Sequence, residues 1–402
     1  MKTQDSGSDI VFLSAVRTPF GTFGGTLKDM TAIDLTVVAA KEAMKRAGIE
    51  PTEIQHSIFG NVLPTTADAI YFARHVALKS GCAIETSALT VNRLCGSGFQ
   101  AVVNGAQEII LGDSDVCLVG GGESMSQAPH VARGLRWGAQ LGKSPVLEDL
   151  LWESLKDPIP GISMAETAEE LASDYKLDRG CVDEFALRSQ TLAKDAWAAG
   201  AFDEEIVPVP VKNAKTKQME DFKRDEHMRP DTTAEALAKL RPYFKADGVV
   251  TAGNASGIGD GAAALVIASA AFAKKRGLTP IGRLVSWGTA GVDPRIMGIG
   301  PVPASRNALA RAQMSIDDMD LIEINEAFAP QACAVERELK FKRERFNVHG
   351  GAIALSHPLA ASGARITAHL LHALRAQGKR YGLGSACIGG GQGIALIVES
   401  MT

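Results

Sequence analysis

The chain repeats itself over a long interval, and this internal repeat restricts its fold more than any other feature of the sequence. Residues 308–325 have the pattern of residues 43–60, an amphipathic helix end followed by a short turn and a strand, at an offset of 265 (308 − 43). Residues 360–366 (AASGARI) match residues 95–101 (CGSGFQA) at the same offset (360 − 95 = 265). Self-similarity at a fixed spacing indicates repeated structural units. The sequence therefore predicts two homologous halves.

A third match and the local patterns indicate that both halves are α/β. The glycine-rich segments 119–124 (VGGGES) and 388–393 (IGGGQG) match at an offset of 269 (388 − 119), close to that of the other pairs. Residues 10–16 form an apolar run typical of a buried strand. Residues 97–111 are apolar at helical spacing and are followed by Gly112, a typical helix stop. This alternation favours mixed or parallel sheets with helices packed on them.

Residues between about 126 and 245 break the alternation, so we expect an insertion between the repeated units. Within it, residues 211–230 carry six Lys or Arg and four Asp or Glu. Such a stretch is typical of a solvated loop, and the alternative is a lid that meets an anionic ligand.

The charge balance and the cysteine spacing argue against several classes of protein. The 42 Lys and Arg against 46 Asp and Glu give a net charge of −4, which does not suit a nucleic-acid or anionic-membrane surface. The six cysteines are never spaced as CxxC and no HExxH occurs, so neither a metal site nor a disulfide framework is expected. No apolar run reaches the roughly 20 residues of a membrane span. The start, MKTQDSGSD, lacks an apolar or arginine-rich targeting pattern, so a cytoplasmic location is expected.

Cys95 is a candidate nucleophile because it precedes Gly-Ser-Gly at a predicted turn into a helix. The helix dipole stabilises a thiolate at a helix N-terminus, and the glycines leave backbone N–H groups accessible to an oxyanion. A single cysteine is more often a small buried apolar residue, so the prediction depends on the glycine context.

Three further residues could act with Cys95. His357 lies three residues before Ala360, the repeat counterpart of Cys95, so the duplication brings it near the related helix start, where a neutral imidazole could take a thiol proton. Cys387 ends a predicted strand beside a glycine run and would supply a second thiol for acid–base chemistry. Asn325 could hold a water or an oxyanion, or could cap a helix. Together these residues describe a cysteine-dependent acyl transferase. The glycine runs lack GxxxxGK[ST], so they are not phosphate loops.

Segments spread along nearly the whole chain resemble the motifs of the thiolase family. They are NRLCGSGFQA (92–101), GGGESMS (120–126), MAETAE (164–169), DEHMR (225–229), TAGNASGIGDGAAA (251–264), MGIGPVPA (297–304), NEAFA (325–329), GGAIALSHPLAASGAR (350–365) and CIGGGQG (387–393). The resemblance implies two duplicated βαβαβαββ halves in five layers, α-β-α-β-α, with a loop domain inserted in the first half. The first half would comprise residues 1–125 and 246–272, the inserted loop domain residues 126–245, and the second half residues 273–402.

The resemblance also implies a role for each candidate residue. Cys95 would be the acylated nucleophile and His357 its activator, while Cys387 would remove or return the α-proton of the substrate. Asn325 and His357 would hold a water in one oxyanion hole, and the backbone N–H groups of Cys95 and Gly389 would form the other. Positions that contact coenzyme A in the family are occupied here by Met164, Arg229, Ala252, Ser256, Met297 and Phe328.

The activity implied by the resemblance is that of an acyl-CoA:acetyl-CoA C-acyltransferase of fatty acid metabolism. It would condense acetyl-CoA with an acyl-CoA to a 3-ketoacyl-CoA and would catalyse the reverse thiolysis. Coenzyme A and its thioesters would be substrates, no metal or other cofactor is expected, and the protein would be a homodimer or homotetramer without nucleic-acid or membrane partners. A degradative thiolase for longer chains is the nearest variant. A Cys/His/Asn hydrolase, which would not need Cys387, and a non-catalytic acyl-CoA-binding protein are the alternatives.

The sequence departs from the family pattern at a few positions. The usual GHPxG reads SHPLA, with Ser356 and Ala360 in place of glycines. Alanine at a positive φ would cost about 1–2 kcal/mol, so we expect ordinary backbone geometry at Ala360. His349 and Gly259 each replace a frequent Asn, and Ser163 stands where short-chain members often have His, which bears on the acyl-chain preference.

Overall fold

The structure of the protein is a computed structural model that describes residues 9–213 and 216–401. Nine of the strands in these residues follow one hydrogen-bonded path in the order β14-β15-β16-β13-β1-β12-β5-β3-β4, and β2 (Gly21–Thr22) pairs with β12 beside it. The strands of the path are β1 (Ile10–Arg17), β3 (His56–Gly60), β4 (Ser87–Val91), β5 (Val116–Ser124), β12 (Gly259–Ser269), β13 (Gly282–Gly291), β14 (Leu321–Ile324), β15 (Tyr381–Ile388) and β16 (Gln392–Ser400).

The path divides into two halves with equivalent strand pairing, as the internal repeat predicts. In the first half, β3 is parallel to β5, β5 is antiparallel to β12, and β12 is antiparallel to β1. In the second half, β14 is parallel to β15, β15 is antiparallel to β16, and β16 is antiparallel to β13. The halves join where β1 and β13 pair at Val11–Arg283 and Phe12–Gly282. The duplication read from the sequence is therefore present in the sheet.

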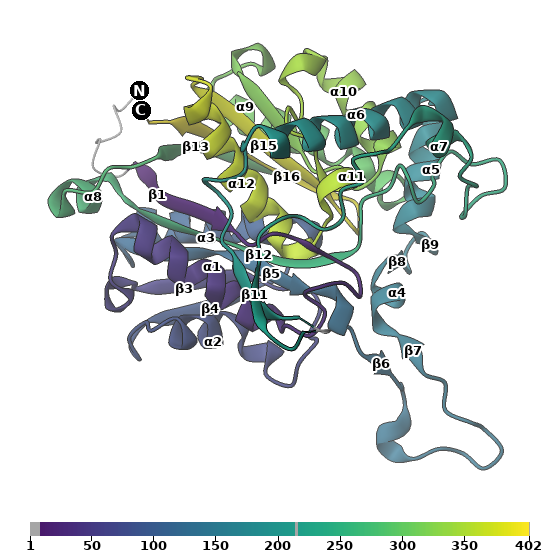
Figure 1. The fold of residues 1–402 in the computed structure, drawn as a ribbon, viewed down its shortest axis with the longest axis horizontal. Helices are drawn as coiled ribbons and strands as arrows, with labels where there is room; N and C mark the ends of the chain where they lie inside the picture. Colours follow the sequence, from purple (N-terminus) through teal and green to yellow (C-terminus); the bar gives the residue numbers. More distant parts are fainter. Residues whose placement is uncertain (1–8, 214–215, 402) are drawn as a thin grey trace.

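Alternating side chains on the strands create three apolar cores that separate five layers. Along β12, Ala264 and Val266 face an outer core under α1, whereas Leu265 and Ile267 face a central core that contains α3 and α12. A third core lies between the second half-sheet and the helices α9 and α10. This arrangement confirms the predicted fold, with the purple first half below the yellow second half in Figure 1. The layer helices are α1 (Ala32–Ala47), α2 (Phe72–Lys79), α3 (Ser97–Leu111), α9 (Pro301–Ala312), α10 (Ala329–Leu339) and α12 (Leu359–Ala376).

Two equivalent glycines let the central helices touch. Gly98 on α3 and Gly363 on α12 are 265 residues apart (363 − 98), the offset of the repeat. A Cβ on Gly98 would lie 2.5 Å from the backbone nitrogen of Ala364, and a Cβ on Gly363 would collide with the backbone nitrogen of Phe99. Because only glycine has no Cβ, only glycine permits this approach. The first turns of α3 and α12 therefore lie against one another.

The insertion forms helices against the second half and a projecting arm. α5 (Met164–Asp174) and α6 (Arg179–Ala198) pack on the third core. Residues 132–147 leave the body as an arm that starts and ends at the paired strands β6 (His130–Val131) and β7 (Glu148–Asp149), at the lower right of Figure 1. Large apolar side chains are exposed along the arm: Trp137, Leu141, Val146 and Leu147.

Short elements complete the described residues. They are α4 (Leu150–Ser154), α7 (Ala234–Ala238), α8 (Ala270–Arg276), α11 (Ala352–Leu355), β8 (Lys156–Asp157), β9 (Ile162–Ser163), and the hairpin strands β10 (Val209–Lys212) and β11 (Met219–Phe222). Residues 214–215, which fall in the charged segment, lie outside the described residues.

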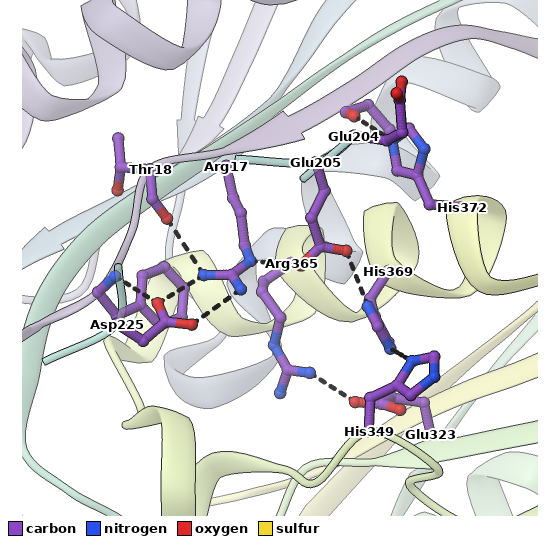
Figure 2. Close-up of polar contacts among 12 residues, drawn as sticks. Arg17, Thr18, Glu204, Glu205, Asp225, Glu323, His349, Arg365, His369 and His372 are labelled. Atoms are coloured by element: carbon purple, nitrogen blue, oxygen red, sulfur yellow. Dashed lines mark hydrogen bonds and ion pairs between the residues drawn. The ribbon is translucent and has the colours of Figure 1, made fainter. Parts of the chain in front are cut away.

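Most side chains of the charged segment 211–230 are exposed, as expected of a solvated loop, and Asp225 is the exception among its described charged residues. Asp225 is buried and pairs with the buried Arg17 of β1 at 2.7 Å. Arg17 also pairs with Glu205 of the insertion at 2.6 Å, and Glu205 bonds to His369 of α12 at 2.8 Å (Figure 2). Buried charges thus fasten the insertion to both halves. Because the two carboxylates compensate Arg17, this network costs less than an isolated buried charge would.

Candidate active site

Cys95 lies in a tight turn at the start of α3. The turn is a 3-10 segment, Leu94–Gly96, in which Leu94 takes a positive φ of 47°. A Cβ at Gly96 would lie 2.6 Å from the side chain of Ile388, so glycine lets this turn rest on the end of β15. The part-buried Cys95 packs against a small core that includes Leu359, the first residue of α12. The nucleophile candidate therefore sits where the two halves meet.

Cys387 reaches the same place from the second half. It is the penultimate residue of β15, is fully buried, and packs beside the part-buried Met164 and Phe328. Burial raises the pKa of its thiol, and a charge on Cys95 raises this pKa further because the two sulfurs are close enough to interact. The structure thus brings together the two thiols that the sequence singled out.

Burial keeps the Cys95 thiol neutral. It raises the pKa of the thiol to about 11, against hydrogen bonds from the backbone N–H groups of Gly389 and of Cys95 itself, which favour the thiolate. The carboxylate of Glu123 adds to the rise. At physiological pH Cys95 therefore needs a base before it can act as a nucleophile. The two N–H groups named as one oxyanion hole converge on this sulfur.

Hydrogen bonds hold the imidazole of His357 in one tautomer. Its Nδ1 bonds to Ser362 Oγ at 2.5 Å, and this hydroxyl donates to the carbonyl of Pro358 at 3.0 Å. Because the hydroxyl proton is used in the second bond, Nδ1 carries the ring proton and Nε2 keeps its lone pair. Burial and the guanidinium of Arg365 lower the pKa of His357 to about 3, so the ring is neutral. A neutral imidazole of this tautomer can accept a thiol proton at Nε2.

Asn325 faces the same nitrogen from the end of β14. It is fully buried, and its amide nitrogen donates to His357 Nε2 at 3.2 Å. Within residues 9–213 and 216–401, its Oδ1 has no hydrogen-bond partner. A buried amide oxygen of this kind can accept from a water or from a bound molecule. Asn325 and His357 therefore present hydrogen-bonding atoms to a ligand that binds beside them.

An apolar pocket of about 170 Å³ is lined by His357, whereas Cys95, Cys387 and Asn325 do not line it. Ser256, Met164 and Phe328 also line the pocket, and the last two pack against the small core that contains Cys387. Trp152 and Phe244, stacked with their ring centroids 6.3 Å apart, line it as well. The remaining wall residues are Met125, Leu155, Ser163, Ala165, Ala255, Gly257, Ile258 and Leu359. An apolar pocket with few polar groups at its reactive end suits an extended thioester substrate.

The other predicted coenzyme A contacts are distributed differently. Met297 is buried beside Cys387 and does not line the pocket. Ala252 and Arg229 are exposed and do not line it either, and Arg229 is held through its backbone N–H, which donates to Gln190 at 2.9 Å. The structure therefore brings only Met164, Ser256 and Phe328 of the six to the pocket wall.

Sequence reasoning missed several residues of the site. Trp152 and Phe244 lie in the irregular insertion, where no periodic pattern marks a side chain as pocket-lining. Ser362, which fixes the His357 tautomer, and Glu123, which acts on Cys95, stand inside motifs that were identified, but only their neighbours were singled out. Ser362 and Glu123 could therefore have been found from the motif segments that contain them.

The departures from the family pattern have clear local outcomes. Ala360 lies in the first turn of α12 with helical geometry, as predicted. Ser356 instead takes φ 83°, a conformation that favours glycine, and its hydroxyl donates to the carbonyl of Gly257 at 3.0 Å. Ser163 caps α5, where its hydroxyl accepts from the N–H of Glu166 at 3.3 Å, and it also lines the pocket.

The described residues contain neither a metal-binding cluster nor a helix that could span a membrane. No group of three or more His, Cys, Asp or Glu side chains in them could hold a metal ion. None of their helices combines the length and the apolar character that crossing a membrane requires.

Comparisons with known proteins agree with this architecture. Residues 10–271 match the N-terminal domain of thiolase and residues 278–400 its C-terminal domain. The chain is 54% identical to the mitochondrial 3-ketoacyl-CoA thiolase of Homo sapiens over 391 residues, which cover 97% of this chain and 98% of that protein. A crystal structure of the human enzyme in complex with CoA has a TM-score of 0.95 at 54% identity, with 98% of each chain covered. The Bacillus anthracis acetyl-CoA acetyltransferase has a TM-score of 0.95 at 46% identity, with 98% of this chain and 99% of that chain covered.

The comparisons contradict the expected cytoplasmic location. Relatives that are 52–54% identical over 97% of this chain are mitochondrial enzymes. The expectation was based only on the absence of a targeting pattern at the start of the sequence. No other feature of the chain supported it. Because both thiolase domains match this chain and a thiolase is 54% identical to it over 97% of its length, the chain belongs to the thiolase family of enzymes.

Proposed function

We propose that this thiolase condenses acetyl-CoA with an acyl-CoA to a 3-ketoacyl-CoA and catalyses the reverse thiolysis. The names of its relatives, 3-ketoacyl-CoA thiolase and acetyl-CoA acetyltransferase, support the activity. The observation that carries the proposal is that the turn with Cys95 rests on the end of β15 that carries Cys387, where a Cβ on Gly96 would lie 2.6 Å from the side chain of Ile388. One thiol can hold the acyl group while the other moves a proton, and a hydrolase would need only the first.

The first step acylates Cys95. The thiol gives its proton to His357 Nε2, and the sulfur attacks the carbonyl carbon of an acyl-CoA. The carbon–sulfur bond to coenzyme A breaks, and the leaving thiolate takes the proton of Cys387. Acylation thus leaves Cys387 as a thiolate, although burial raises the pKa of its thiol in the resting enzyme. A covalent intermediate divides one difficult reaction into two easier ones.

The second step forms the carbon–carbon bond. The Cys387 thiolate removes an α-proton from acetyl-CoA, and the resulting enolate attacks the acyl carbon on Cys95. The Cys95 sulfur leaves and recovers its proton from His357, so both residues return to their starting state. Oxyanion holes would stabilise the charged oxygens, one with His357 and a water on Asn325, the other with the N–H groups of Cys95 and Gly389. Losing one such donor typically costs about 10²–10³ in rate.

The pocket is proposed to hold the thioester arm of the substrate. Its wall residues Met164, Ser256 and Phe328 support this, and a crystal structure of the human relative contains CoA. Met297 would contact the reacting end from its position beside Cys387. Ala252 and Arg229, both exposed, would contact the outer end of coenzyme A, where the Arg229 guanidinium can pair with a phosphate.

We also propose the division into a first half (1–125 and 246–272), an inserted loop domain (126–245) and a second half (273–402). The loop domain would bind coenzyme A and make contacts between subunits. Its arm exposes apolar side chains such as Trp137 and Leu141, which favours burial against other copies in a homodimer or homotetramer.

The test is to mix the enzyme with acetyl-CoA, digest it, and measure acetylated peptides and soluble products by mass spectrometry. The proposal predicts acetyl on Cys95 and a 3-ketoacyl-CoA product, with both absent in Cys95→Ala. Free acetate as the main product would favour a hydrolase instead. An unlabelled Cys95 with tight acyl-CoA binding would favour a non-catalytic binding protein.

A further inference from the structure

Glu123 is a buried carboxylate at the junction of the two halves. It is the penultimate residue of β5 and has no exposed surface. One of its carboxylate oxygens accepts from Val62 N–H at 3.2 Å and from Ala360 N–H at 3.1 Å, and the other from Leu63 N–H at 3.0 Å and from Asn61 Nδ2 at 3.2 Å. Glu123 therefore joins the loop after β3 to the first turn of α12.

No positive charge compensates this carboxylate in the structure. No ion pair of the described residues includes Glu123, and the nearby carboxylate of Asp260 on β12 repels it. Burial accordingly raises the pKa of Glu123 to about 7. An amide at this position would offer one acceptor oxygen instead of two, so the four N–H donors around Glu123 favour a carboxylate in spite of its desolvation cost.

The internal repeat places an apolar side chain at the matching position of the second half. The pairing of β3 with β5 at His56–Cys117 corresponds to the pairing of β14 with β15 at Leu321–Gly382, so Glu123 matches Ile388 at the offset of 265 (388 − 123). Ile388 lies against the Cys95 turn, where a Cβ on Gly96 would lie 2.6 Å from its side chain. Each strand end thus contacts the helix start of the other half, with an apolar side chain on one side and a carboxylate on the other.

The carboxylate acts on both partners of the first chemical step. It holds Ala360, three residues after His357, and α12 begins between them. Its negative charge also raises the pKa of Cys95. A charge on this thiol in turn raises the pKa of Cys387.

We infer that Glu123 is a positioning residue for acyl transfer, which fixes the start of α12 so that His357 meets Cys95 and which places a negative charge near the Cys95 thiol. The inference rests on the proposed function. It assigns the carboxylate two effects, one geometric and one electrostatic, and the two can be separated by substitution.

Glu123→Gln removes the charge and leaves one acceptor oxygen for the four N–H donors that Glu123 satisfies. The rate of Cys95 alkylation by iodoacetamide, followed by peptide mass spectrometry in a Cys181→Ser background, should show its inflection at a lower pH than in the parent. The kcat for thiolysis should fall about 10- to 100-fold with KM little changed, because a misplaced base slows only chemistry. Gln392→Leu breaks a hydrogen bond to Arg93, in the loop just before Cys95, without altering a carboxylate, and its alkylation profile should coincide with that of the parent.

Glu123→Asp keeps the charge but shortens the reach. Its alkylation inflection should remain at the parental pH while kcat falls. Superimposable alkylation profiles for Glu123→Gln and the parent, or a change in KM alone, would overturn the inference. Should Glu123→Gln fail to fold, Glu123→Asp decides, and an unchanged kcat would then overturn it. Alkylation needs no turnover, so a failure of the proposed function would leave this readout intact.

Discussion

The amide nitrogen of Asn325 lies 3.2 Å from Nε2 of His357, and the other nitrogen of that ring is bonded to Ser362. The imidazole is therefore held from both sides in one tautomer. Burial lowers the pKa of His357 to about 3, so it meets the substrate neutral and able to accept a proton. This arrangement makes the ring orientation, and not only the ring itself, part of the catalytic geometry.

Ser362→Ala should weaken catalysis without touching any reacting group. The substitution removes the acceptor of the Nδ1 proton, so the ring can rotate or change tautomer. The kcat for thiolysis should fall about tenfold or more. Ser362→Thr, which keeps a hydroxyl, is the matched control and should restore much of the activity. Equal kcat values for Ser362→Ala and the wild type would show that Ser362 does not orient the ring.

Asn325→Ala should separate acylation from condensation. The acyl group can still be transferred to Cys95, but the enolate loses the water held by the amide oxygen. Condensation should slow about 10²–10³-fold. Acetylation of Cys95 in a single turnover should slow less, about tenfold at most, because Ser362 still holds the His357 ring from its other side. Stopped-flow release of coenzyme A measures the first step and product analysis the second. Parallel loss of both steps would contradict the assigned role.

Cys181 should be the most reactive thiol at neutral pH, although it lies outside the active site. A hydrogen bond from the Cys333 thiol and the charge of Arg337 lower the pKa of Cys181 to about 6 against the effect of burial, and the residue is part-exposed at the start of α6. Iodoacetamide at pH 7 should label Cys181 before the buried Cys117, whose pKa is raised. Cys181→Ser should keep full thiolase activity. Faster labelling of Cys117 would contradict this ranking.

The raised pKa of Glu123 predicts a specific pH dependence of stability. The unfolded-state pKa is about 4.3 and the folded value about 7, so the folded protein binds the proton more tightly. The stabilising contribution is fully present below about pH 4.3 and is lost as the pH rises toward 7, on the order of 1–3 kcal/mol. Denaturant unfolding at several pH values should therefore give a wild-type-minus-Glu123→Gln difference that falls over this window. A constant difference would contradict the prediction.

Gly98→Ala should destabilise the fold through the contact between α3 and α12. Its Cβ would lie 2.5 Å from the backbone nitrogen of Ala364, and backbone cannot move aside as a side chain does. A loss of about 1–3 kcal/mol is expected, measured by denaturant unfolding. Gly180→Ala is the control, because its Cβ on α6 would meet only Asp178 Oδ1 at 3.3 Å. Similar stability of the two variants would argue against a tight crossing.

Much of the fold could be predicted because both repeated halves bury the same faces of their helices and strands, and this burial produces the periodic patterns and the duplication in the sequence. The helix expected at 97–111 is α3, Ser97–Leu111, and strands β3 and β14 begin 265 residues apart (321 − 56). The convergence of Cys95 and Cys387 was predicted for a related reason, since each ends or begins an element at the junction of the halves.

The features that could not be predicted depend on contacts between distant residues, which produce no pattern in the local sequence. The stacking of Trp152 on Phe244 is made by the irregular insertion, and the burial of Asp225 with Arg17 joins residues more than 200 positions apart (225 − 17). The unfavourable positive φ occurs at Ser356, whereas the family pattern had raised the question of backbone strain at Ala360, which is helical. Such features follow from tertiary packing, which local patterns do not encode.

The central claim is that the second thiol moves the α-proton while the first carries the acyl group. The most direct measurement follows deuterium uptake from D₂O into the methyl group of acetyl-CoA by Cys387→Ala, together with acetylation of Cys95. The account predicts that Cys95 is still acetylated and that deuterium uptake and condensation are lost. Deuterium uptake at the wild-type rate in Cys387→Ala would contradict it.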